Sequence, residues 1–213
     1  MEIIRTENLT KIYRRRHLGR IKETVGIKKI DLEVREGEIF ALLGLNGSGK
    51  TTTIKLILGL LFPTEGKIYI DGQLMPERKI IRQIGYLPEL PYFYKYLSVV
   101  ELLNFYAHLS GLSFETRKKQ INRILEMLRL EEHKTKRLGE LSRGMLQRVG
   151  LAQALVHQPR ILILDEPVAG LDPLGIREMR EFLTHLKSEG KTIFFSSHII
   201  SEVEKISDRV GIL

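Results

Sequence analysis

The sequence predicts an α/β fold with a mostly parallel sheet, antiparallel strands near the N-terminus and an inserted helical subdomain. Two strand-like apolar runs, residues 161–164 and 192–196, flank a helical pattern over about residues 174–188. Continuous apolar strands separated by helices are typical of a parallel sheet that is buried on both faces. From about Pro91 to Val156 only helical patterns occur, and this change predicts the insertion.

The N-terminal part alternates between short strands and turns. Residues 2–9 predict a strand, and the alternating apolar and charged residues 30–34 predict a half-exposed one. The stretch between them predicts a basic loop with the cationic residues Lys11, Arg14, Arg15, Arg16, Arg20 and Lys22. After a turn at residues 36–37, residues 39–43 predict a short buried strand.

A glycine-rich loop and a helix follow this buried strand. The helix is predicted from Lys50 to about Leu60, and the Phe-Pro-Thr sequence of residues 62–64 is expected to end it. Residues 66–71 with Gly72 then predict a hairpin.

Three helical patterns fill the insertion, over residues 99–109, 115–130 and 143–156. We therefore expect one domain over residues 1–213, in which 1–90 and 157–213 form a catalytic core and 91–156 form a helical subdomain. The chain ends at Leu213 inside an apparent strand, an ending that is compatible with a missing C-terminal segment.

Composition places the chain among ordinary globular proteins. Of its 213 residues, 43% are hydrophobic and 28% charged, and the absence of cysteine excludes disulfides and cysteine-based metal sites. The N-terminus lacks the apolar core of a signal peptide. The longest apolar stretch, residues 56–62, is far shorter than the roughly 20 residues that span a bilayer. We expect a protein that is soluble by itself and that reaches a membrane only through a partner.

The net charge of +8 is compatible with nucleic acid or an anionic membrane surface as a partner. The basic loop has a single aromatic ring, Tyr13, and no sustained interleaving of aromatic residues. A solvated loop that faces water or lipid headgroups is the simpler interpretation. Charge alone does not decide between these partners.

Residues 44–51, GLNGSGKT, match the phosphate-binding pattern G-x-x-x-x-G-K-[ST] between a predicted strand and a predicted helix. Glycines let the backbone turn so that its N–H groups and the helix N-terminus surround a polyphosphate. In this pattern Lys50 places its charge on the β- and γ-phosphates, and the hydroxyl of Thr51 binds Mg²⁺. The residues expected to bind the phosphates are Gly44, Leu45, Asn46, Gly47, Ser48, Gly49, Lys50, Thr51 and Thr52.

Two acids, Asp165 and Glu166, directly follow the buried run of residues 161–164. They therefore lie at the carboxyl end of a strand, where open α/β sheets bind ligands. We expect Asp165 to hold Mg²⁺ through its water shell and Glu166 to accept a proton from an attacking water. The loop and the two acids together predict a P-loop NTPase core that hydrolyses a nucleotide.

With the motifs around them, these residues make the chain resemble the ATP-binding cassette (ABC) family, the ATPase subunits or domains of ABC transporters. The resemblance covers nearly the whole chain, in the family's motif order. Residues 44–51 correspond to the Walker A loop, and residues 161–166 to Walker B with the catalytic glutamate. The remaining motifs are Tyr13 as the aromatic that stacks on adenine, residues 141–145 in the place of the family signature, residues 169–172 as the D-loop, and His198 as the switch histidine.

The resemblance implies a role for each of these residues. Ser142 and Gly144 are expected to contact the γ-phosphate of ATP held by a second subunit, because they open a helix whose N–H groups can receive an anion. Asp172 is expected to belong to the same nucleotide site. His198 is expected to stabilise the γ-phosphate, alongside Lys50 and the general base.

Two positions depart from the family pattern. The signature is usually LSGGQ, whereas this chain has LSRGM, with Arg143 for the first glycine and Met145 for the glutamine. The family's Q-loop glutamine is here Glu89, a carboxylate that can bind Mg²⁺ but cannot donate a hydrogen bond when ionised. Both features resemble bacterial ATPase subunits of export-type systems.

The resemblance also implies partners and a location. The chain is expected to form a head-to-tail homodimer, or to pair with a related ATPase subunit, with ATP and Mg²⁺ at the interface. Closure and hydrolysis would drive translocation by a separate integral membrane subunit. The chain would then be cytoplasmic and peripheral on the inner face of the cell membrane, with no specific nucleic-acid partner.

Three other readings of the sequence stay open. A soluble cassette ATPase could act on ribosomes or nucleic acid, although such proteins usually carry two cassettes, or long insertions and basic tails. A regulatory GTPase is disfavoured by the missing Asn/Thr-Lys-x-Asp motif. A binding module without catalysis is disfavoured because Glu166 and His198 are both present.

Overall fold

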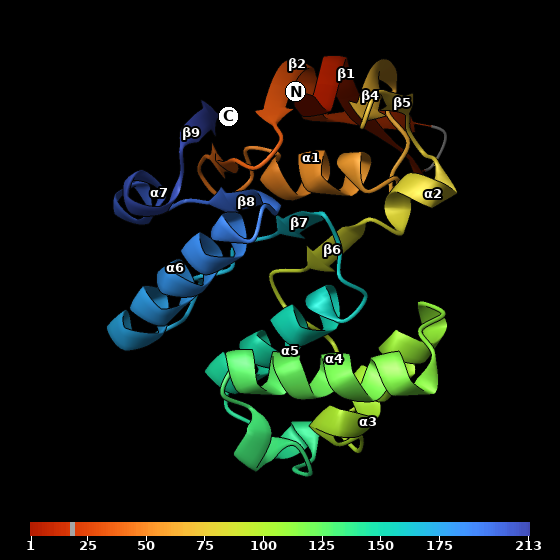
Figure 1. The fold of residues 1–213 in the computed structure, drawn as a ribbon. Helices are drawn as coiled ribbons and strands as arrows, with labels where there is room; N and C mark the ends of the chain where they lie inside the picture. Colours follow the sequence, from red (N-terminus) through yellow and green to blue (C-terminus); the bar gives the residue numbers. More distant parts are fainter. Residues whose placement is uncertain (18–19) are drawn as a thin grey trace.

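A computed structural model describes residues 1–17 and 20–213 of the chain (Figure 1). Its antiparallel sheet has the strand order β2-β1-β4-β5, with β1 Glu2–His17, β2 Arg20–Arg35, β4 Glu65–Ile70 and β5 Gln73–Leu74. Its parallel sheet has the order β6-β7-β8-β3-β9, with β6 Ile84–Leu87, β7 Ile161–Leu164, β8 Thr192–Ser197, β3 Ile39–Leu43 and β9 Arg209–Ile212. The α/β class, the parallel sheet and the N-terminal antiparallel strands are confirmed.

Helices cover both faces of the parallel sheet. The α-helices are α1 Lys50–Ile57, α2 Arg78–Ile81, α3 Val99–Leu109, α4 Phe114–Met127, α5 Arg143–Leu155, α6 Pro173–Ser188 and α7 Ile200–Ile206. Two short 3₁₀ helices, η1 Glu131–His133 and η2 Leu138–Glu140, lie between α4 and α5. None of the helices in the described part of the chain is long and apolar enough to cross a membrane.

The parallel sheet is the middle layer of the molecule, with the antiparallel sheet and α1 on one side and α3 to α6 on the other (Figure 1). Successive residues of a strand point to opposite faces. Phe40 and Phe194 pack in the apolar cluster with α1, whereas Ala41 and Phe195 pack in the cluster with the helices of the other face. The sheet is therefore buried on both faces, as its continuous apolar strands predict.

The predicted basic loop is wrong for the residues that the structure describes. The two N-terminal strands continue through it as a long antiparallel hairpin, with Arg14 opposite Glu23 and Arg16 opposite Ile21. Charged residues have low β-propensity, so the many charged residues of this stretch predicted a loop and not strands. Residues 18–19 and the side chains of Arg15 and Arg20 lie outside the described part of the hairpin.

Helix α1 ends earlier than the sequence predicts. Gly59 adopts a left-handed φ of 69°, its N–H bonds to the carbonyl of Leu56, and the N–H of Leu60 bonds to the carbonyl of Lys55. This pair of hydrogen bonds is the Schellman motif, in which a glycine ends a helix. Gly59, and not the proline at position 63, stops the helix.

The segment from 91 to 156 contains α3, α4 and α5, and the chain returns from it to β7, the strand next to β6. Its apolar side chains belong to the same cluster as one face of the sheet. Two glycines allow the close approach: a Cβ at Gly85 would collide with the carbonyl of Ala154, and a Cβ at Gly150 would lie 2.5 Å from Leu87. That these residues form a separate subdomain stays a prediction.

Candidate functional site

Three adjacent strands bring the predicted catalytic residues to one edge of the parallel sheet. The strands β7, β8 and β3 are neighbours and parallel. Asp165 and Glu166 follow β7, His198 follows β8, and the glycine-rich loop follows β3. Because the carboxyl ends of parallel strands meet at one edge, residues more than 100 positions apart in the chain become neighbours here.

The glycine-rich loop has no room for side chains at two of its glycines. A Cβ at Gly44 would lie 2.5 Å from the hydroxyl of Ser48, and a Cβ at Gly49, whose φ is 109°, would lie 2.6 Å from the carbonyl oxygen of Gly26. The hydroxyl of Ser48 is buried and has no hydrogen-bond partner among the described residues. Helix α1 begins without a side-chain cap and has no acid in its first turn. Its first N–H groups and this hydroxyl suit an anion such as a phosphate chain.

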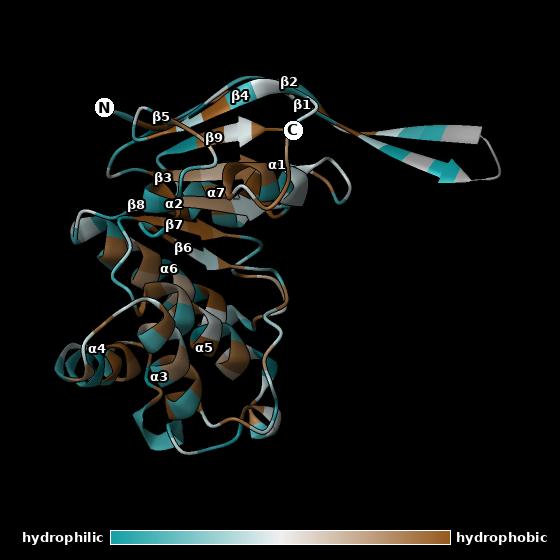
Figure 2. Ribbon diagram, turned by 90° about the vertical axis from the view of Figure 1, so that its right-hand side faces the viewer, coloured by the Kyte–Doolittle hydropathy of each residue, from teal (hydrophilic) through white to brown (hydrophobic). Residues whose placement is uncertain are grey.

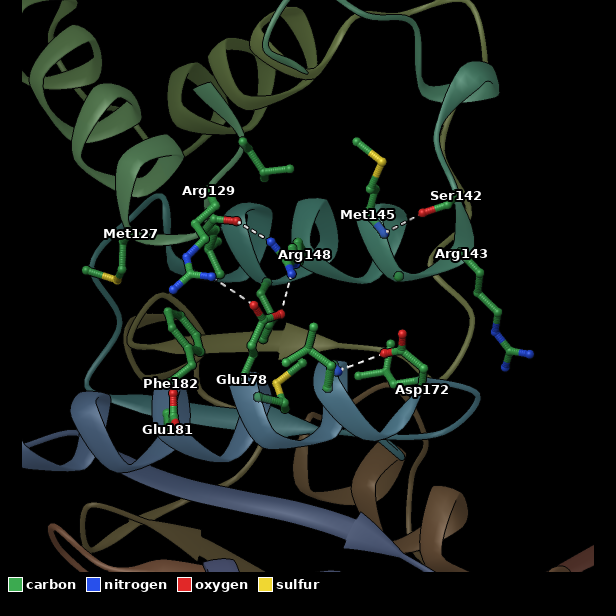
Figure 3. A pocket seen from close by; sticks show the side chains of 18 of the residues that line it. Met127, Arg129, Ser142, Arg143, Met145, Arg148, Asp172, Glu178, Glu181 and Phe182 are labelled. Carbon is green, nitrogen blue, oxygen red and sulfur yellow. Dashed lines mark hydrogen bonds and ion pairs between the residues drawn. The ribbon is translucent and has the colours of Figure 1, made fainter. Parts of the chain in front are cut away.

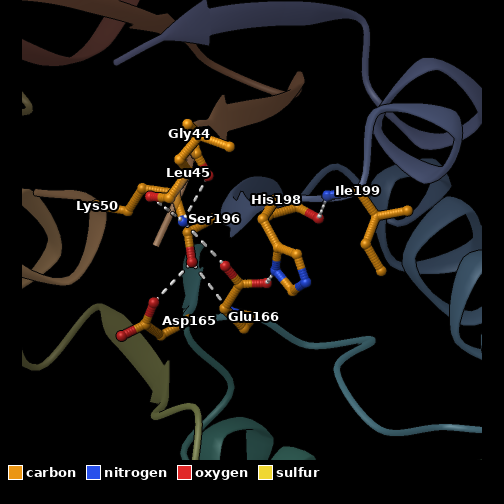
Figure 4. A network of polar contacts seen from close by, with 9 residues as sticks. Gly44, Leu45, Lys50, Asp165, Glu166, Ser196, His198 and Ile199 are labelled. Carbon is orange, nitrogen blue, oxygen red and sulfur yellow. Dashed lines mark hydrogen bonds and ion pairs between the residues drawn. The ribbon is translucent and has the colours of Figure 1, made fainter. Parts of the chain in front are cut away.

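Glu166 lies between two cationic or potentially cationic groups (Figure 4). Its Oε1 is 3.2 Å from the Nζ of Lys50, and its Oε2 is 2.9 Å from the Nδ1 of His198. Lys50 also donates hydrogen bonds to the carbonyls of Gly44 and Leu45, at 2.7 and 3.2 Å. The ammonium group therefore connects the phosphate-binding loop to the carboxylate, and both side chains are buried.

Asp165 and Glu166 are also held by Ser196, a residue that the sequence did not single out. The Ser196 hydroxyl donates to Oδ1 of Asp165 at 2.6 Å and accepts from the N–H of Glu166 at 2.9 Å (Figure 4). A serine fully buried in a strand must satisfy its hydroxyl. The polar Ser-Ser pair that ends the apolar strand before His198 was the available signal.

The negative charge of Asp165 also affects Tyr86. Burial of the Tyr86 hydroxyl, and to a lesser extent the charge of Asp165, raise the pKa of Tyr86 to about 12.

The backbone of Glu166 has a φ of 52°, in the left-handed region that residues other than glycine rarely adopt. Such a conformation costs of the order of 1–3 kcal/mol and occurs mainly where the surroundings hold it. Here the Ser196 hydroxyl holds the Glu166 N–H, and Lys50 and His198 contact its carboxylate. The turn directs this side chain toward the phosphate-binding loop.

Tyr13 lies beside the same loop. Its hydroxyl is 3.2 Å from that of Thr52 in α1, and its ring packs over Gly26, where a Cβ would lie 2.7 Å from the ring. The Lys11 ammonium is 5.6 Å from the ring centre. Tyr13 is thus near the start of α1, and its role in stacking on adenine stays a prediction.

The signature and D-loop residues lie together, in a different part of the chain's surface from Lys50. Ser142 caps α5 by accepting from the N–H of Met145 at 3.3 Å, and Asp172 caps α6 by accepting from the N–H of Gly175 at 2.8 Å. Both line a cavity of about 710 Å³ between α5 and α6 (Figure 3). Lys50, Glu166 and His198 do not line it.

Side chains of α5, of α6 and of the segment that follows α4 meet in this cavity through one carboxylate. Glu178 of α6 accepts from Arg129 at 2.9 Å and from Arg148 of α5 (Figure 3). Arg143 lies instead on the D-loop, because a Cβ at Gly170 would be 2.6 Å from the guanidinium carbon. The arginine that replaces the first signature glycine thus covers a D-loop glycine of its own chain.

Metal binding rests on few protein ligands. No group of three or more histidine, aspartate or glutamate side chains within the described residues could hold a metal ion by itself. Mg²⁺ usually keeps several waters and takes one or two carboxylates together with substrate phosphates, so Asp165 with the Thr51 hydroxyl fits this ion. Glu89 is exposed and makes no hydrogen bond or ion pair with another described residue, and its contact with Mg²⁺ stays a prediction.

The fold and the glycine-rich loop define a P-loop protein of the α/β class. A sequence model of the ABC transporter family matches residues 27–169. An uncharacterised ABC transporter ATP-binding protein of Nostoc is 46% identical over 99% of this chain and 63% of the relative. The bacitracin transport ATP-binding protein of Bacillus licheniformis is 44% identical over 99% of this chain and 66% of the relative. The chain therefore belongs to the ABC transporter family, as an ATP-binding protein.

Solved structures agree with this assignment. A dimeric ATP-binding cassette in a post-hydrolysis state, bound to ADP and phosphate, superposes with a TM-score of 0.88 at 28% identity. That similarity covers 99% of this chain and 94% of the other. The chain spans only about 60–66% of the length of the first relatives that it matches.

Proposed function

We propose that this chain binds ATP with Mg²⁺, hydrolyses it to ADP and phosphate, and thereby powers a membrane transporter. The observation that carries the proposal is the position of Glu166, with Lys50 on one carboxylate oxygen and His198 on the other. A carboxylate at this sheet edge, beside a phosphate-binding loop, has the chemistry that phosphoanhydride hydrolysis requires.

In the proposed reaction a water attacks the γ-phosphorus, and the bond between that phosphorus and the ADP oxygen breaks. Glu166 accepts the proton of the water, Lys50 offsets the negative charge of the phosphate oxygens, and His198 orients the Glu166 carboxylate and contacts the γ-phosphate. Asp165 and Thr51 would hold Mg²⁺, which when bound would supply positive charge to the phosphate oxygens. Tyr13 stacks on the adenine.

We infer that two copies, or one copy and a related subunit, share the ATP sites. Ser142 and Asp172 line a cavity that Lys50 does not line, so an ATP that touches all three needs a second chain. The dimeric cassette of similar fold supports the same arrangement. Ser142 and Gly144 of one copy would then close on the γ-phosphate held by the other.

The transporter partner is an integral membrane subunit. It docks on this chain at the segment that follows β6. Tyr92, Tyr94 and Tyr96 in this segment are 91%, 62% and 67% exposed, and exposed tyrosines are enriched at protein interfaces. Glu89 lies three residues before the first of them. Export is the proposed direction, from the similarity of Glu89 and the LSRGM signature to export-type subunits. The chain would sit in the cytoplasm on the inner face of the membrane.

Phosphate release tests the hydrolysis. The chain should release phosphate from ATP faster than from GTP, lose the activity when Mg²⁺ is chelated, and lose it in the Lys50→Ala variant. Release that is indifferent to Mg²⁺ and to Lys50 would reject the proposed site. Purification of the full-length protein from native membranes, with identification of the proteins bound to it, tests the membrane partner.

A further inference from the structure

Almost all of the net charge of the chain is concentrated in one hairpin. Residues 11–29 contain eight lysines and arginines and one acid, Glu23, a net charge of +7 out of +8 for the whole chain. The remaining residues are nearly neutral in sum. A segment with this charge is a local cationic surface, not a consequence of a basic protein overall.

The charged segment is the part of the hairpin that extends away from the body. Strand β1 pairs with β4 only as far as Thr10 opposite Glu65, and beyond this point it pairs with β2 alone. Seven further residues of β1 at about 3.3 Å each make an arm of roughly 20 Å. Figure 2 shows the arm projecting from the rest of the molecule. We call residues 11–29 the basic arm.

The base of the arm packs on the body, and the outer cations whose side chains the structure describes face solvent. Tyr13 packs on Gly26 across the hairpin and contacts Thr52 of α1. Farther out, Arg14, Arg16 and Lys22 are exposed, and of the arm's described side chains only Arg14 has a carboxylate partner, Glu23 at 2.8 Å. An exposed ion pair of this kind contributes little to stability, so folding does not account for the concentration of cations.

We propose that the basic arm binds the anionic headgroups of the membrane beside the transporter. Clusters of lysine and arginine are attracted to negatively charged leaflets, and a projecting arm can contact a surface that the body of the protein does not touch. Nucleic acid is the weaker candidate, because single strands are usually held by stacking on several aromatic rings and Tyr13 already packs against the protein. The membrane as the relevant surface rests on the proposed function.

Vesicle co-sedimentation tests the proposal without requiring ATP hydrolysis. The whole chain should bind vesicles that contain phosphatidylglycerol and should not bind pure phosphatidylcholine vesicles. Removal of each charge should weaken the binding about fivefold, so the R14Q/R16Q/K22Q variant should lose on the order of 100-fold. Raising the salt from about 0.1 to 1 M, which shortens the screening length from about 10 to 3 Å, should abolish the wild-type binding.

The matched control removes three exposed charges that lie outside the arm: K118Q, K119Q and K136Q. This variant should bind the vesicles like the wild type, and both variants should keep the wild-type melting temperature and ATPase rate. Equal loss in both variants, or binding that ignores lipid charge, would overturn the proposal. Tight, salt-dependent binding of single-stranded RNA without vesicle binding would also overturn it, in favour of RNA. A wild-type chain without ATPase activity would reject the proposed function but not the lipid binding.

Discussion

Replacing Glu166 with glutamine tests the general base directly. The amide keeps the size of the carboxylate, and its oxygen can still face Lys50 at the 3.2 Å that separates Oε1 from Nζ. It cannot accept a proton from water at neutral pH. A positioned base contributes about 10²–10⁴ to a rate, so the hydrolysis rate should fall by that factor, which corresponds to about 3–5 kcal/mol of barrier. Glu166 is the only carboxylate within ion-pair distance of Lys50 in the described structure, so its removal frees the ammonium and ATP should bind at least as tightly.

Single-turnover phosphate release gives the rate, and a fluorescent nucleotide gives the affinity. The expected pattern is a fall in kcat without a rise in KM, because only a transition-state interaction is lost. Stalled ATP should also hold two copies together, so the variant should sediment as a monomer without nucleotide and as a dimer with ATP. Glu131→Gln, an exposed acid outside the site, should behave like the wild type. Hydrolysis by Glu166→Gln at the wild-type rate would refute the assignment and direct attention to His198.

The remaining predictions concern Glu89, Ser142 and Gly85. Glu89→Ala should raise the Mg²⁺ concentration needed for half-maximal ATPase activity, whereas Glu89→Gln should keep measurable activity because one acceptor oxygen remains. Mixtures of Ser142→Arg with Lys50→Ala chains should recover hydrolysis that neither variant has alone, because one of the two shared sites is then intact. Gly85→Ala, whose Cβ would collide with the carbonyl of Ala154, should lower the free energy of unfolding by about 1–3 kcal/mol, measured by urea denaturation.

Each of these predictions has a result that contradicts it. An unchanged Mg²⁺ dependence in Glu89→Ala would exclude a metal contact. No recovery in mixtures, with heterodimers shown to form, would argue against sites shared between chains. For Gly85 the matched control is Gly139→Ala, whose Cβ would lie 3.3 Å from Lys95 at the nearest; equal destabilisation of both would mean that the tight packing between β6 and α5 is not the cause.

The proximity of Lys50, Glu166 and His198 could be predicted because two simple rules place these residues. The spacing of the motifs identifies Lys50 and Asp165. The carboxyl ends of parallel strands lie at the same edge of the sheet, and this places Glu166 and His198 near Lys50 and Asp165. Ser196 could not be singled out by the same rules. In the sequence, a serine in an apolar strand gives no indication of whether its hydroxyl bonds to the nearby backbone or to a distant carboxylate. Its role depends on strand order, which the sequence leaves undetermined.

The errors in the fold have equally local causes. Lysine and glutamate are depleted in strands, but a two-stranded arm in water has no buried face from which charged side chains are excluded. The density of charged residues therefore predicted a loop where a hairpin forms. At the end of α1, Phe-Pro-Thr gave a plausible stop, yet Gly59 comes first along the chain and satisfies the helix carbonyls through backbone hydrogen bonds. The contact between Arg143 and Gly170 could not be predicted because it joins the first turn of α5 to a loop 27 positions away in the chain.

The position of the helical segment between neighbouring strands β6 and β7 has a consequence for exchanging parts between relatives. The segment leaves the sheet at Leu87 and returns at Ile161, so its two ends are only about one strand length apart, and a transplant needs no long linkers. The packing between α5 and β6 restricts the exchange, however. The carbonyl of Ala154 in α5 lies against Gly85 of β6, and Gly150 of α5 lies against Leu87. Chimaeras that keep these two glycines as a pair should have a higher free energy of unfolding than chimaeras that lack one of them.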